Sequence, residues 1–489
     1  MSKKNSISLI TCLVCVSVLI EAKNYKVGIV HYRVGKTDGV SLEIEKRKQV
    51  LEKMGCEVVL ISGPVQHGAD FILDELEFEN PKIKEIKENS FAYFEKNTIT
   101  PEKLLRKINH IAHTIEKKFL DYFYKQEFDL LLIHNVFSLG LHLPAAQAFY
   151  NIARKTGIPI IATHHDYYWE RERFKKPANN LIIRFLSKYI PPCLENVTHV
   201  CINSLAQNDL VEKRGIDSYV LPDVFDFEQS LWKKDSYNID FYKRIGVKEN
   251  DIIVLQATRI VERKGIELAI QFVKELNINK HRLIGKKLYN GKIVTKESDI
   301  VLVFAGYPEN FALPYLQKLK MEITNTQIQA RFIYDMIDAQ RLYNKITGKK
   351  IYSLWDAYVF ADIVTYPSLW EGWGNQFIEA IFAKKPIVVF EYPVFTVDIK
   401  KEGYSVISLG SIITGKKVQG LVQVSQEKLE SACTQAIEIL ISKSTPKILE
   451  NNFSLGQQYH GYHVLEKFLG RQLNKLFSNK VRFQLLFQV

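Results

Sequence analysis

The chain has 489 residues, of which 46% are hydrophobic and 25% charged, a composition typical of a folded globular protein rather than a disordered one. This length gives room for two or three domains. The formal charge of +12 suits an anionic substrate or a membrane face, and it is equally typical of solvated surface lysines. The basic runs are short and lack the arginine and aromatic clustering of a nucleic-acid groove, so we expect no nucleic-acid partner.

The N-terminal segment resembles the beginning of a signal peptide, with Lys3 and Lys4 ahead of the apolar run 7–20. That run is too short for an ordinary membrane span, and Ile20 fits poorly as the small residue expected before a cleavage site after Ala22. We therefore expect residues 1–24 to be an uncleaved apolar extension. A weak membrane anchor, giving peripheral membrane contact, and an early start codon are the alternatives.

The six cysteines show neither the density of a disulfide framework nor a convincing metal-binding spacing. Cys12 and Cys15 form a C-x-x-C, but it lies in the apolar run without a second ligand pair. We therefore expect a reducing compartment and no metal site.

Strands and helices alternate through the first half of the chain. Strands are predicted at 26–32, 57–62, 128–134, 158–163, 199–204 and 219–223, and helices at 41–54 and 104–124. This alternation predicts a parallel sheet with helices on both faces and ligands at the carboxyl ends of the strands.

A second series begins at Asp251, which makes the polar stretch 225–250 the expected linker between two domains, 25–224 and 251–455. Its strands are predicted at 252–257, 300–306, 331–334, 363–367 and 387–391. The sequence thus predicts an α/β protein with two doubly wound, Rossmann-like parallel sheets.

The most informative segment is 367–380, Pro-Ser-Leu-Trp-Glu-Gly-Trp-Gly-Asn-Gln-Phe-Ile-Glu-Ala. Gly372 and Gly374 lie where a strand turns into a helix, and the free N–H groups of a helix start favour anions. Glu371 and Glu379 flank that turn, and each carboxylate can accept hydrogen bonds from sugar or ribose hydroxyls. The competing interpretation is a capped helix with two solvated glutamates.

This segment resembles the P-S-x-x-E-G-x-G-x-x-x-x-E-A signature of the retaining glycosyltransferases of family 4, the glycosyl transferases group 1, which have the GT-B fold. The following Lys-Lys-Pro-Ile-Val-Val of 384–389 continues the match. Residues 256–265 are similar to the family's strand followed by G-R-x-x-x-x-K-G. The resemblance implies two domains facing across a cleft, with the donor mainly on the second and the acceptor mainly on the first. The family's last helix crosses back to the first domain, a role that falls to residues 456–489.

The resemblance also assigns roles to residues of the second domain. Arg259 and Lys264 would bind the donor diphosphate, which gains charge as it leaves. Glu379 would hold the ribose, and Glu371 would lie near the hydroxyls of the transferred sugar. Backbone amides directed at the diphosphate or the sugar are expected from the start of the helix, at Gly374, Asn375 and Gln376. These groups can neutralise the leaving group without a divalent metal, so no cofactor is expected.

Two loops of the first domain are candidates for contacting the donor from the other side. Family members have a Gly-Gly loop against the donor phosphates, and Asp38-Gly39 replaces that pair, so that only Gly39 is carried over. After the strand 158–163, where the family often places a histidine that reaches the donor sugar, both His164 and His165 are candidates. A histidine satisfied within a turn is the alternative for either.

Three further residues are weaker candidates in the first domain. Asp166 follows the two histidines, and His134 and Asn135 end another strand, where they would lie near the acceptor.

The expected reaction is transfer of a hexose from a nucleoside-diphosphate sugar to a hydroxyl of a sugar, glycerate-type, lipid or glycan acceptor, for which an anion is one candidate. The matched motifs hold no carboxylate suited to attack the opposite sugar face, so the resemblance favours same-face substitution with retention. Residues 352–358 and 256–264 also resemble the branch of the family that makes compatible solutes such as mannosylglucosylglycerate. A family enzyme needs the cytosolic pool of sugar nucleotides, which predicts a cytoplasmic protein.

Two other classes remain open: a non-catalytic nucleotide-sugar-binding protein of the same fold, and another GT-B enzyme such as a sugar-nucleotide epimerase or a phosphorylase. The latter enzymes lack the pair Glu371 and Glu379 combined with Arg259 and Lys264.

Overall fold

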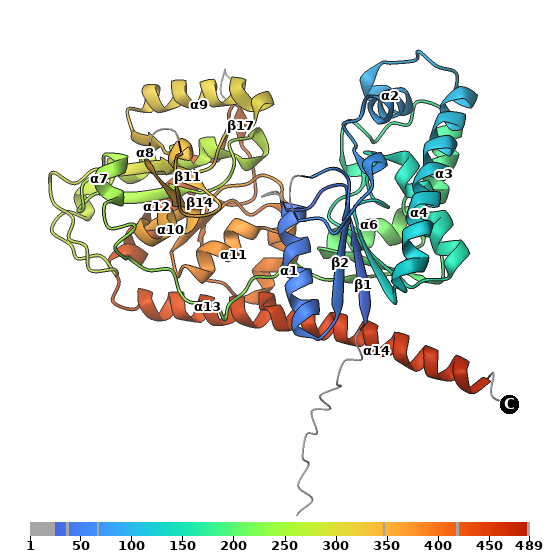
Figure 1. Ribbon diagram of the computed structural model, residues 1–489. Helices are drawn as coiled ribbons and strands as arrows, with labels where there is room; N and C mark the ends of the chain where they lie inside the picture. Colours follow the sequence, from blue (N-terminus) through green and yellow to red (C-terminus); the bar gives the residue numbers. More distant parts are fainter. Residues whose placement is uncertain (1–24, 36–38, 66–67, 346–347, 417–419, 487–489) are drawn as a thin grey trace, which may run out of the picture.

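The computed structural model describes residues 25–35, 39–65, 68–345, 348–416 and 420–486. Its two largest sheets belong to two domains that lie side by side (Figure 1). Every neighbouring strand pair in these two sheets is parallel, which confirms the predicted fold class. The N-terminal extension expected over residues 1–24 lies outside the described residues.

The sheet of the first domain has the strand order β3-β2-β1-β4-β5-β6-β7. Its strands are β1 (Lys26–Val30), β2 (Glu57–Ser62), β3 (Phe71–Ile72), β4 (Leu130–His134), β5 (Ile160–His164), β6 (Val197–Cys201) and β7 (Ser218–Val220). Its helices are α1 (Gly39–Lys53), α2 (Pro81–Ser90), α3 (Pro101–Gln126), α4 (Leu143–Thr156), α5 (Asn180–Tyr189) and α6 (Ser204–Arg214). The strand order reverses between β1 and β4.

The sheet of the second domain has the order β10-β9-β8-β14-β15-β16 and reverses between β8 and β14. Its strands are β8 (Ile252–Gln256), β9 (Ile300–Phe304), β10 (Gln329–Phe332), β14 (Ile363–Tyr366), β15 (Ile387–Val389) and β16 (Ile407–Ser408). Its helices are α7 (Phe241–Ile245), α8 (Ile266–Ile278), α9 (Leu313–Thr326), α10 (Leu354–Phe360), α11 (Asn375–Phe382), α12 (Gln426–Ile441) and α13 (Thr445–His460). A small three-stranded sheet contains β11 (Ile337–Asp338), β12 (Leu342–Tyr343) and β13 (Lys350–Ser353). A two-stranded sheet contains β17 (Gly415–Lys416) and β18 (Val422–Gln423).

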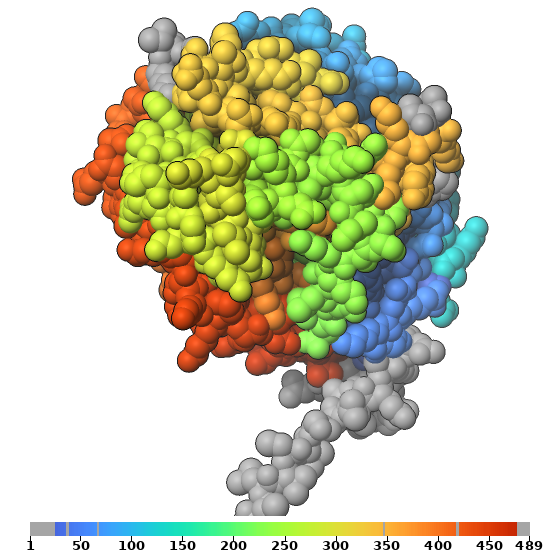
Figure 2. Space-filling model, turned by 90° about the vertical axis from the view of Figure 1, so that its left-hand side faces the viewer, coloured from blue at the N-terminus to red at the C-terminus, as the bar shows by residue number. Residues whose placement is uncertain are grey.

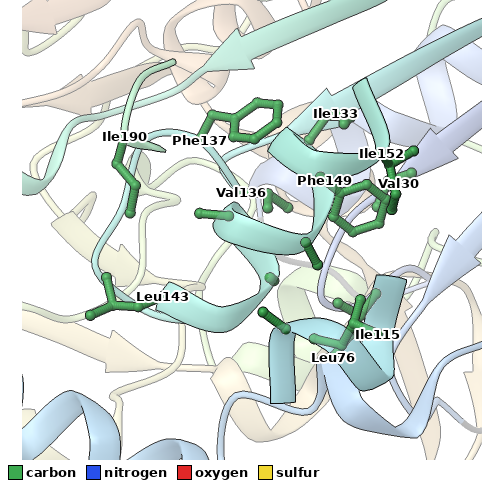
Figure 3. Packing of buried hydrophobic residues seen from close by; sticks show 14 of the residues in the cluster. Val30, Leu76, Ile115, Ile133, Val136, Phe137, Leu143, Phe149, Ile152 and Ile190 are labelled. Carbon is green, nitrogen blue, oxygen red and sulfur yellow. The ribbon is translucent and has the colours of Figure 1, made fainter. Parts of the chain in front are cut away.

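Both faces of the first sheet are buried. Successive residues of a strand point to opposite faces of the sheet, so neighbouring residues of β1 pack into different hydrophobic clusters. Val30 packs into the cluster formed with α3 and α4, where Ile115 and Phe149 lie close to it (Figure 3). Its neighbour Ile29 belongs to the cluster on the other face, with Ile44 of α1. Packing on both faces holds the strands in position, and with them the carboxyl ends from which the loops of the site begin.

Several strand boundaries differ by one to three residues from the sequence-based prediction, and one of them has a clear local cause. Residues 199–204 were expected as a strand, whereas β6 ends at Cys201 and α6 begins at Ser204. The reason is a helix cap: Asn203 Oδ1 accepts a hydrogen bond from the backbone N–H of Ala206 at 2.7 Å.

The stretch 225–250, expected as a polar linker, packs on the second domain. Phe225, Phe227 and Phe241 are buried in an aromatic and aliphatic cluster with residues of β8 and α11. In Figure 2, which looks onto the second domain, this green segment lies against the rest of that domain. The segment therefore contributes to the core of the second domain as well as joining the two.

The last helix, α14 (Tyr462–Leu486), passes beneath the first domain (Figure 1). Leu465 and Leu469 are buried in the cluster that contains Ile44 of α1, and Glu466 pairs with Lys53 of α1 at 2.8 Å. The preceding α13 packs on α11 of the second domain. The chain thus crosses between the domains twice, at the segment after β7 and at Gly461.

Candidate functional site

Two loops of the second domain meet beyond β8 and β14, where the strand order reverses. The 3-10 turn η4 (Glu262–Lys264) belongs to the first loop, and the backbone N–H of Leu369 in the second donates to the carbonyl of Arg263 at 2.9 Å. Gly265 permits this approach, because its φ is +54° and a Cβ there would lie 2.5 Å from the carbonyl oxygen of Pro367. The crevice at such a reversal is where open parallel sheets bind ligands.

Glu371 lies between two cations of the η4 turn. Arg263 Nη1 donates to Glu371 Oε2 at 2.7 Å, and Lys264 Nζ pairs with Oε1. Burial lowers the pKa of Lys264 to about 8, although the Glu371 carboxylate opposes that shift. Burial alone would raise the pKa of Glu371, but Lys264 and Arg263 together hold it below its usual value. The trio therefore contains one carboxylate and two cations, an excess of positive charge beside the crevice.

The start of α11 faces the same crevice. Its N-cap, Gly374, has φ +150° and provides no side-chain cap, and a Cβ there would lie 2.7 Å from Tyr392 Oη. Only glycine fits at this position. Asn375 and Gln376 form the first turn of the helix, whose N–H groups and dipole favour an anion.

Glu379 lies one turn into α11 and is 7% exposed. Tyr358 of α10 donates its hydroxyl to Glu379 Oε2 at 3.0 Å. Burial raises the pKa of Glu379 to about 7, with Tyr358, Lys46 and Lys264 opposing the shift. The carboxyl group is thus held near the start of α11, ready to bond hydroxyl groups.

The first domain presents its own helix start to α11. A Cβ on Gly39, the first residue of α1, would lie 4.0 Å from Asn375 Nδ2. Further along α1, Lys46 Nζ lies 3.4 Å from Asn375 Oδ1 and also donates to the carbonyl of Val224 at 2.5 Å. Two helix N-termini and a lysine therefore converge from both domains.

The structure distinguishes the two candidate histidines. His164 is fully buried, with Nδ1 2.6 Å from Ser138 Oγ and Nε2 2.9 Å from His199 Nδ1, so both ring nitrogens are bonded inside the first domain. His165 is half-buried, and its backbone carbonyl approaches the second domain, since a Cβ on Gly372 would lie 3.3 Å from that oxygen.

The environment of His165 keeps its ring neutral near pH 7. Burial, followed by the nearby Arg47, lowers its pKa well below the usual value. His165 Nε2 lies 3.2 Å from His134 Nδ1, and the backbone N–H of His165 donates to Asn135 Oδ1 at 2.9 Å. The two residues expected as acceptor contacts thus lie beside His165.

Arg259 lies outside the group around Glu371. Its guanidinium pairs with Glu309, in the loop after β9. The cation that joins Lys264 at Glu371 is Arg263 instead.

Several contacts close the two domains over these loops. Asn203 Nδ2 donates to the carbonyl of Gly372 at 2.7 Å, and Ser204 Oγ donates to Asp398 Oδ1 at 2.7 Å. Arg171, which pairs with Asp166 in the first domain, lies 5.3 Å from the ring centroid of Trp370 in the second.

Four residues of this site were missed at the sequence level: Lys46, Arg171, Arg263 and Tyr358. Arg263 stands next to Lys264 in the motif, and only the 3-10 turn brings both onto one carboxylate. Lys46 and Arg171 act across the domain interface, and no short pattern marks such a contact.

The described residues show neither a metal site nor a membrane span. No group of three or more His, Cys, Asp or Glu side chains in that part of the chain is arranged to hold a metal ion. No helix within it is long and apolar enough to cross a membrane.

Comparison with known proteins matches residues 238–431 to the family model "Glycosyl transferases group 1". The mannosylglucosylglycerate synthase of Petrotoga mobilis is 39% identical over 415 residues, covering 85% of this chain and 93% of that protein. The mannosylglucosylglycerate synthase of Thermotoga maritima is 36% identical over 456 residues, covering 92% and 99%. Among solved structures, the sucrose-phosphate synthase of Thermosynechococcus elongatus superposes with a TM-score of 0.55 at 13% identity, covering 94% of this chain and 100% of that one. At that identity the likeness shows the shared fold alone.

Proposed function

The chain belongs to the glycosyl transferases group 1, as the motif resemblance predicted, and we propose that it moves a hexose from a nucleoside-diphosphate sugar to a hydroxyl of a glycerate-type sugar acceptor. The observation that carries this proposal is the grouping of Glu371, Lys264 and Arg263 beside the uncapped start of α11. That grouping supports a binding site for a diphosphate whose charge grows during the reaction.

The leaving diphosphate is neutralised by protein groups. Lys264, Arg263 and the N–H groups at Asn375 and Gln376 supply positive charge from the second domain, and α1 begins at Gly39 on the opposite side. Arg259 joins them by exchanging Glu309 for the diphosphate, which carries two negative charges where the glutamate carries one. Since the charge is balanced in this way, the proposed reaction needs no divalent metal, and we expect EDTA to leave turnover unchanged.

The two glutamates hold different parts of the donor. Glu379 accepts hydrogen bonds from the ribose hydroxyls, since its carboxyl group is buried close to the helix start that binds the phosphates. Glu371 holds the other end, the transferred sugar, and His165, whose backbone carbonyl lies beside Gly372, contributes from the first domain.

The reaction proceeds with retention on one face of the sugar. The acceptor hydroxyl approaches from the first domain, and the departing phosphate oxygen takes its proton. Glu371 is unsuited to attack the opposite face because Arg263 and Lys264 already occupy both of its oxygens. The protein supplies position and charge, and His165, held neutral, orients the sugar.

The acceptor class follows from the relatives. Their shared name describes a product that joins mannosyl, glucosyl and glycerate units, so the acceptor proposed for this chain is a glucosylglycerate-like anion. The donor sugar nucleotides are made in the cytoplasm, where we place the enzyme.

A thermal-shift screen with nucleoside diphosphates and their hexose conjugates tests the donor assignment. A ligand at one hundred times its Kd raises the free energy of unfolding by about 2.7 kcal/mol. Stabilisation by one nucleoside diphosphate, followed by turnover of its hexose conjugate with glucosylglycerate, supports the proposal. Stabilisation without turnover on any acceptor would indicate a non-catalytic binding protein, and interconversion of free sugar nucleotides an epimerase.

A further inference from the structure

Arg171 is a cation of the first domain that reaches the loop of Glu371. It follows β5, and its guanidinium carbon lies 5.3 Å from the ring centroid of Trp370, the residue before Glu371 in the chain. On the other side of Glu371, a Cβ on Gly372 would lie 3.3 Å from the carbonyl oxygen of His165. The segment from His165 to Arg171 therefore contacts the donor loop on both sides of the glutamate.

The backbone around Arg171 is held by hydrogen bonds. The N–H groups of Phe174 and Lys175 donate to the carbonyl oxygen of Arg171 at 2.8 and 3.0 Å. The N–H of Arg171 donates to the carbonyl of Tyr168 at 3.3 Å, and the N–H of Tyr168 donates to the carbonyl of Ser138, after β4, at 2.8 Å. The guanidinium group is thus presented from a hydrogen-bonded turn that is tied to the neighbouring loop.

Most donors of the Arg171 side chain are unused. Its Nη2 pairs with Oδ2 of Asp166, and this is its one hydrogen bond or ion pair to a described residue. Because a guanidinium group carries its N–H donors in a planar fork, a single bond to Asp166 leaves donors for a second acceptor. The side chain is 36% exposed, so an anion can reach these donors.

Two other cations of the first domain lie near the donor loops, and neither offers such donors. Lys46 Nζ already donates to Glu43 Oε1 and to the carbonyl of Val224, both at 2.5 Å. Arg47 is 2% exposed, and its Nη1 bonds Glu43 as well. Of these three cations, Arg171 is the one that combines access with unused N–H groups.

An acceptor of the proposed class brings a carboxylate to this place. In glucosylglycerate the carboxylate belongs to the glycerate unit joined directly to the glucosyl ring, so a cation that binds it must lie close to the hydroxyl that is glycosylated. Arg171 meets this condition, because it contacts the residue next to Glu371, which holds the transferred sugar in the proposed reaction. The Trp370 ring also attracts the guanidinium group and helps to keep it in place.

We propose that Arg171 binds the carboxylate of the acceptor through the N–H groups that Asp166 leaves open, and thereby selects an anionic, glycerate-type acceptor over a neutral one. Asp166 and Trp370 orient the guanidinium group, and the planar fork forms charge-assisted hydrogen bonds, which are the strong ones. The inference rests on the proposed function, since it names the residue that recognises the acceptor of that same reaction.

The kinetic test compares glucosylglycerate with neutral glucosylglycerol, in which a CH₂OH group replaces the carboxylate. Arg171→Gln is expected to lower the ratio of kcat/KM for glucosylglycerate over glucosylglycerol by about 10- to 100-fold, the effect of losing a charge-assisted hydrogen bond. Arg171→Lys, which keeps the charge without the fork, is expected to lower it less. Arg173→Gln makes the same substitution at an exposed position of the same loop and leaves the ratio within about twofold. An unchanged ratio in Arg171→Gln overturns the inference, because a role in holding the domains together lowers kcat/KM for both acceptors alike.

A binding measurement separates this inference from the proposed function. Isothermal titration of the full chain, in the presence of the nucleoside diphosphate selected by thermal shift, compares the two acceptors without turnover. Weaker binding of glucosylglycerate to Arg171→Gln than to the wild type and Arg173→Gln, with glucosylglycerol bound alike by all three, supports the subsite. Equal binding of glucosylglycerate by all three overturns the subsite, while its turnover by the wild type leaves the proposed function standing. A wild type that neither binds nor uses glucosylglycerate removes the proposed acceptor and this inference together.

Discussion

The two domains differ in how the polar and charged groups of the candidate site are paired. On the second domain, Glu371 is bonded to Lys264 and Arg263, and Glu379 accepts from Tyr358, so each carboxylate has its partner before a ligand arrives. On the first domain, by contrast, Nε2 of His134 is buried without a hydrogen bond to any described residue.

This difference corresponds to two tasks. A site that stabilises developing charge works best when its groups are held in place beforehand, which mutual pairing achieves. A site that selects a substrate gains more from groups left unsatisfied, because a wrong substrate then leaves them buried and unpaired. We therefore expect changes among the charged residues of the second domain to act on turnover with every acceptor, and a change at His134 of the first domain to depend on the acceptor used.

The largest effect is expected from the cations of the second domain. Lys264→Ala and Arg259→Ala should each lower kcat by two or more orders of magnitude, because each loses a contact to the leaving diphosphate worth about 3 kcal/mol. Steady-state kinetics with saturating acceptor measure this, and Lys274→Ala, an exposed lysine of α8, is the control. Near-full activity in both variants with every donor tested would place the diphosphate elsewhere.

Substitutions of Glu379 and Glu371 are expected to have different effects on nucleotide binding. Glu379→Ala is expected to weaken nucleoside diphosphate by about 1 to 3 kcal/mol, because ribose hydroxyls lose their acceptor. Glu371→Ala should lower sugar transfer while the affinity for nucleoside diphosphate does not weaken, since Lys264 and Arg263 remain. Isothermal titration and a turnover assay measure both. Equal losses of nucleotide affinity, or none in either variant, would leave the glutamates with a structural role only.

The raised pKa of Glu379 predicts a pH dependence of stability. A carboxyl group whose pKa is about 7 when folded and 4.5 when unfolded stabilises the fold while protonated, fully below pH 4.5, and loses that contribution as the pH rises through 7. Between pH 5 and 8 the wild type should therefore lose about 2 kcal/mol relative to Glu379→Gln. Urea denaturation of the ligand-free proteins at both pH values measures it. Parallel pH profiles for the two proteins would mean that Glu379 is ionised throughout.

The smallest effects are expected from the two neighbouring histidines, His164 and His165. His165→Ala should lower kcat about tenfold with little change in Tm, because its ring orients the sugar at the cleft. His164→Ala should instead lower Tm by several degrees, since it leaves Ser138 and His199 without their bonds. Differential scanning calorimetry beside turnover distinguishes them, and the reverse pattern would exchange the two assignments.

The second domain could be predicted from the sequence further than the first. A strand, a glycine turn and a helix follow one another within 363–382, so the turn could be predicted from local spacing, while the roles proposed for Gly374, Asn375 and Glu379 came from the family resemblance. The choice between His164 and His165 could not be made, because it depends on the partners of the two rings: Ser138 and His199 for His164, and His134 for His165. Lys46 and Arg171 depend on contacts between segments far apart in the chain, and such contacts leave no short pattern.

The product of the reaction tests the central claim, transfer across the cleft from an α-linked nucleoside-diphosphate hexose to glucosylglycerate. The measurement is the mass and the one-bond ¹³C–¹H coupling at the anomeric carbon of the product formed by wild-type protein with the donor selected by thermal shift. We predict one added hexose joined by an α-glycosidic bond. A β-linked product would contradict retention, and the absence of any added hexose with every stabilising donor would contradict the transferase assignment itself.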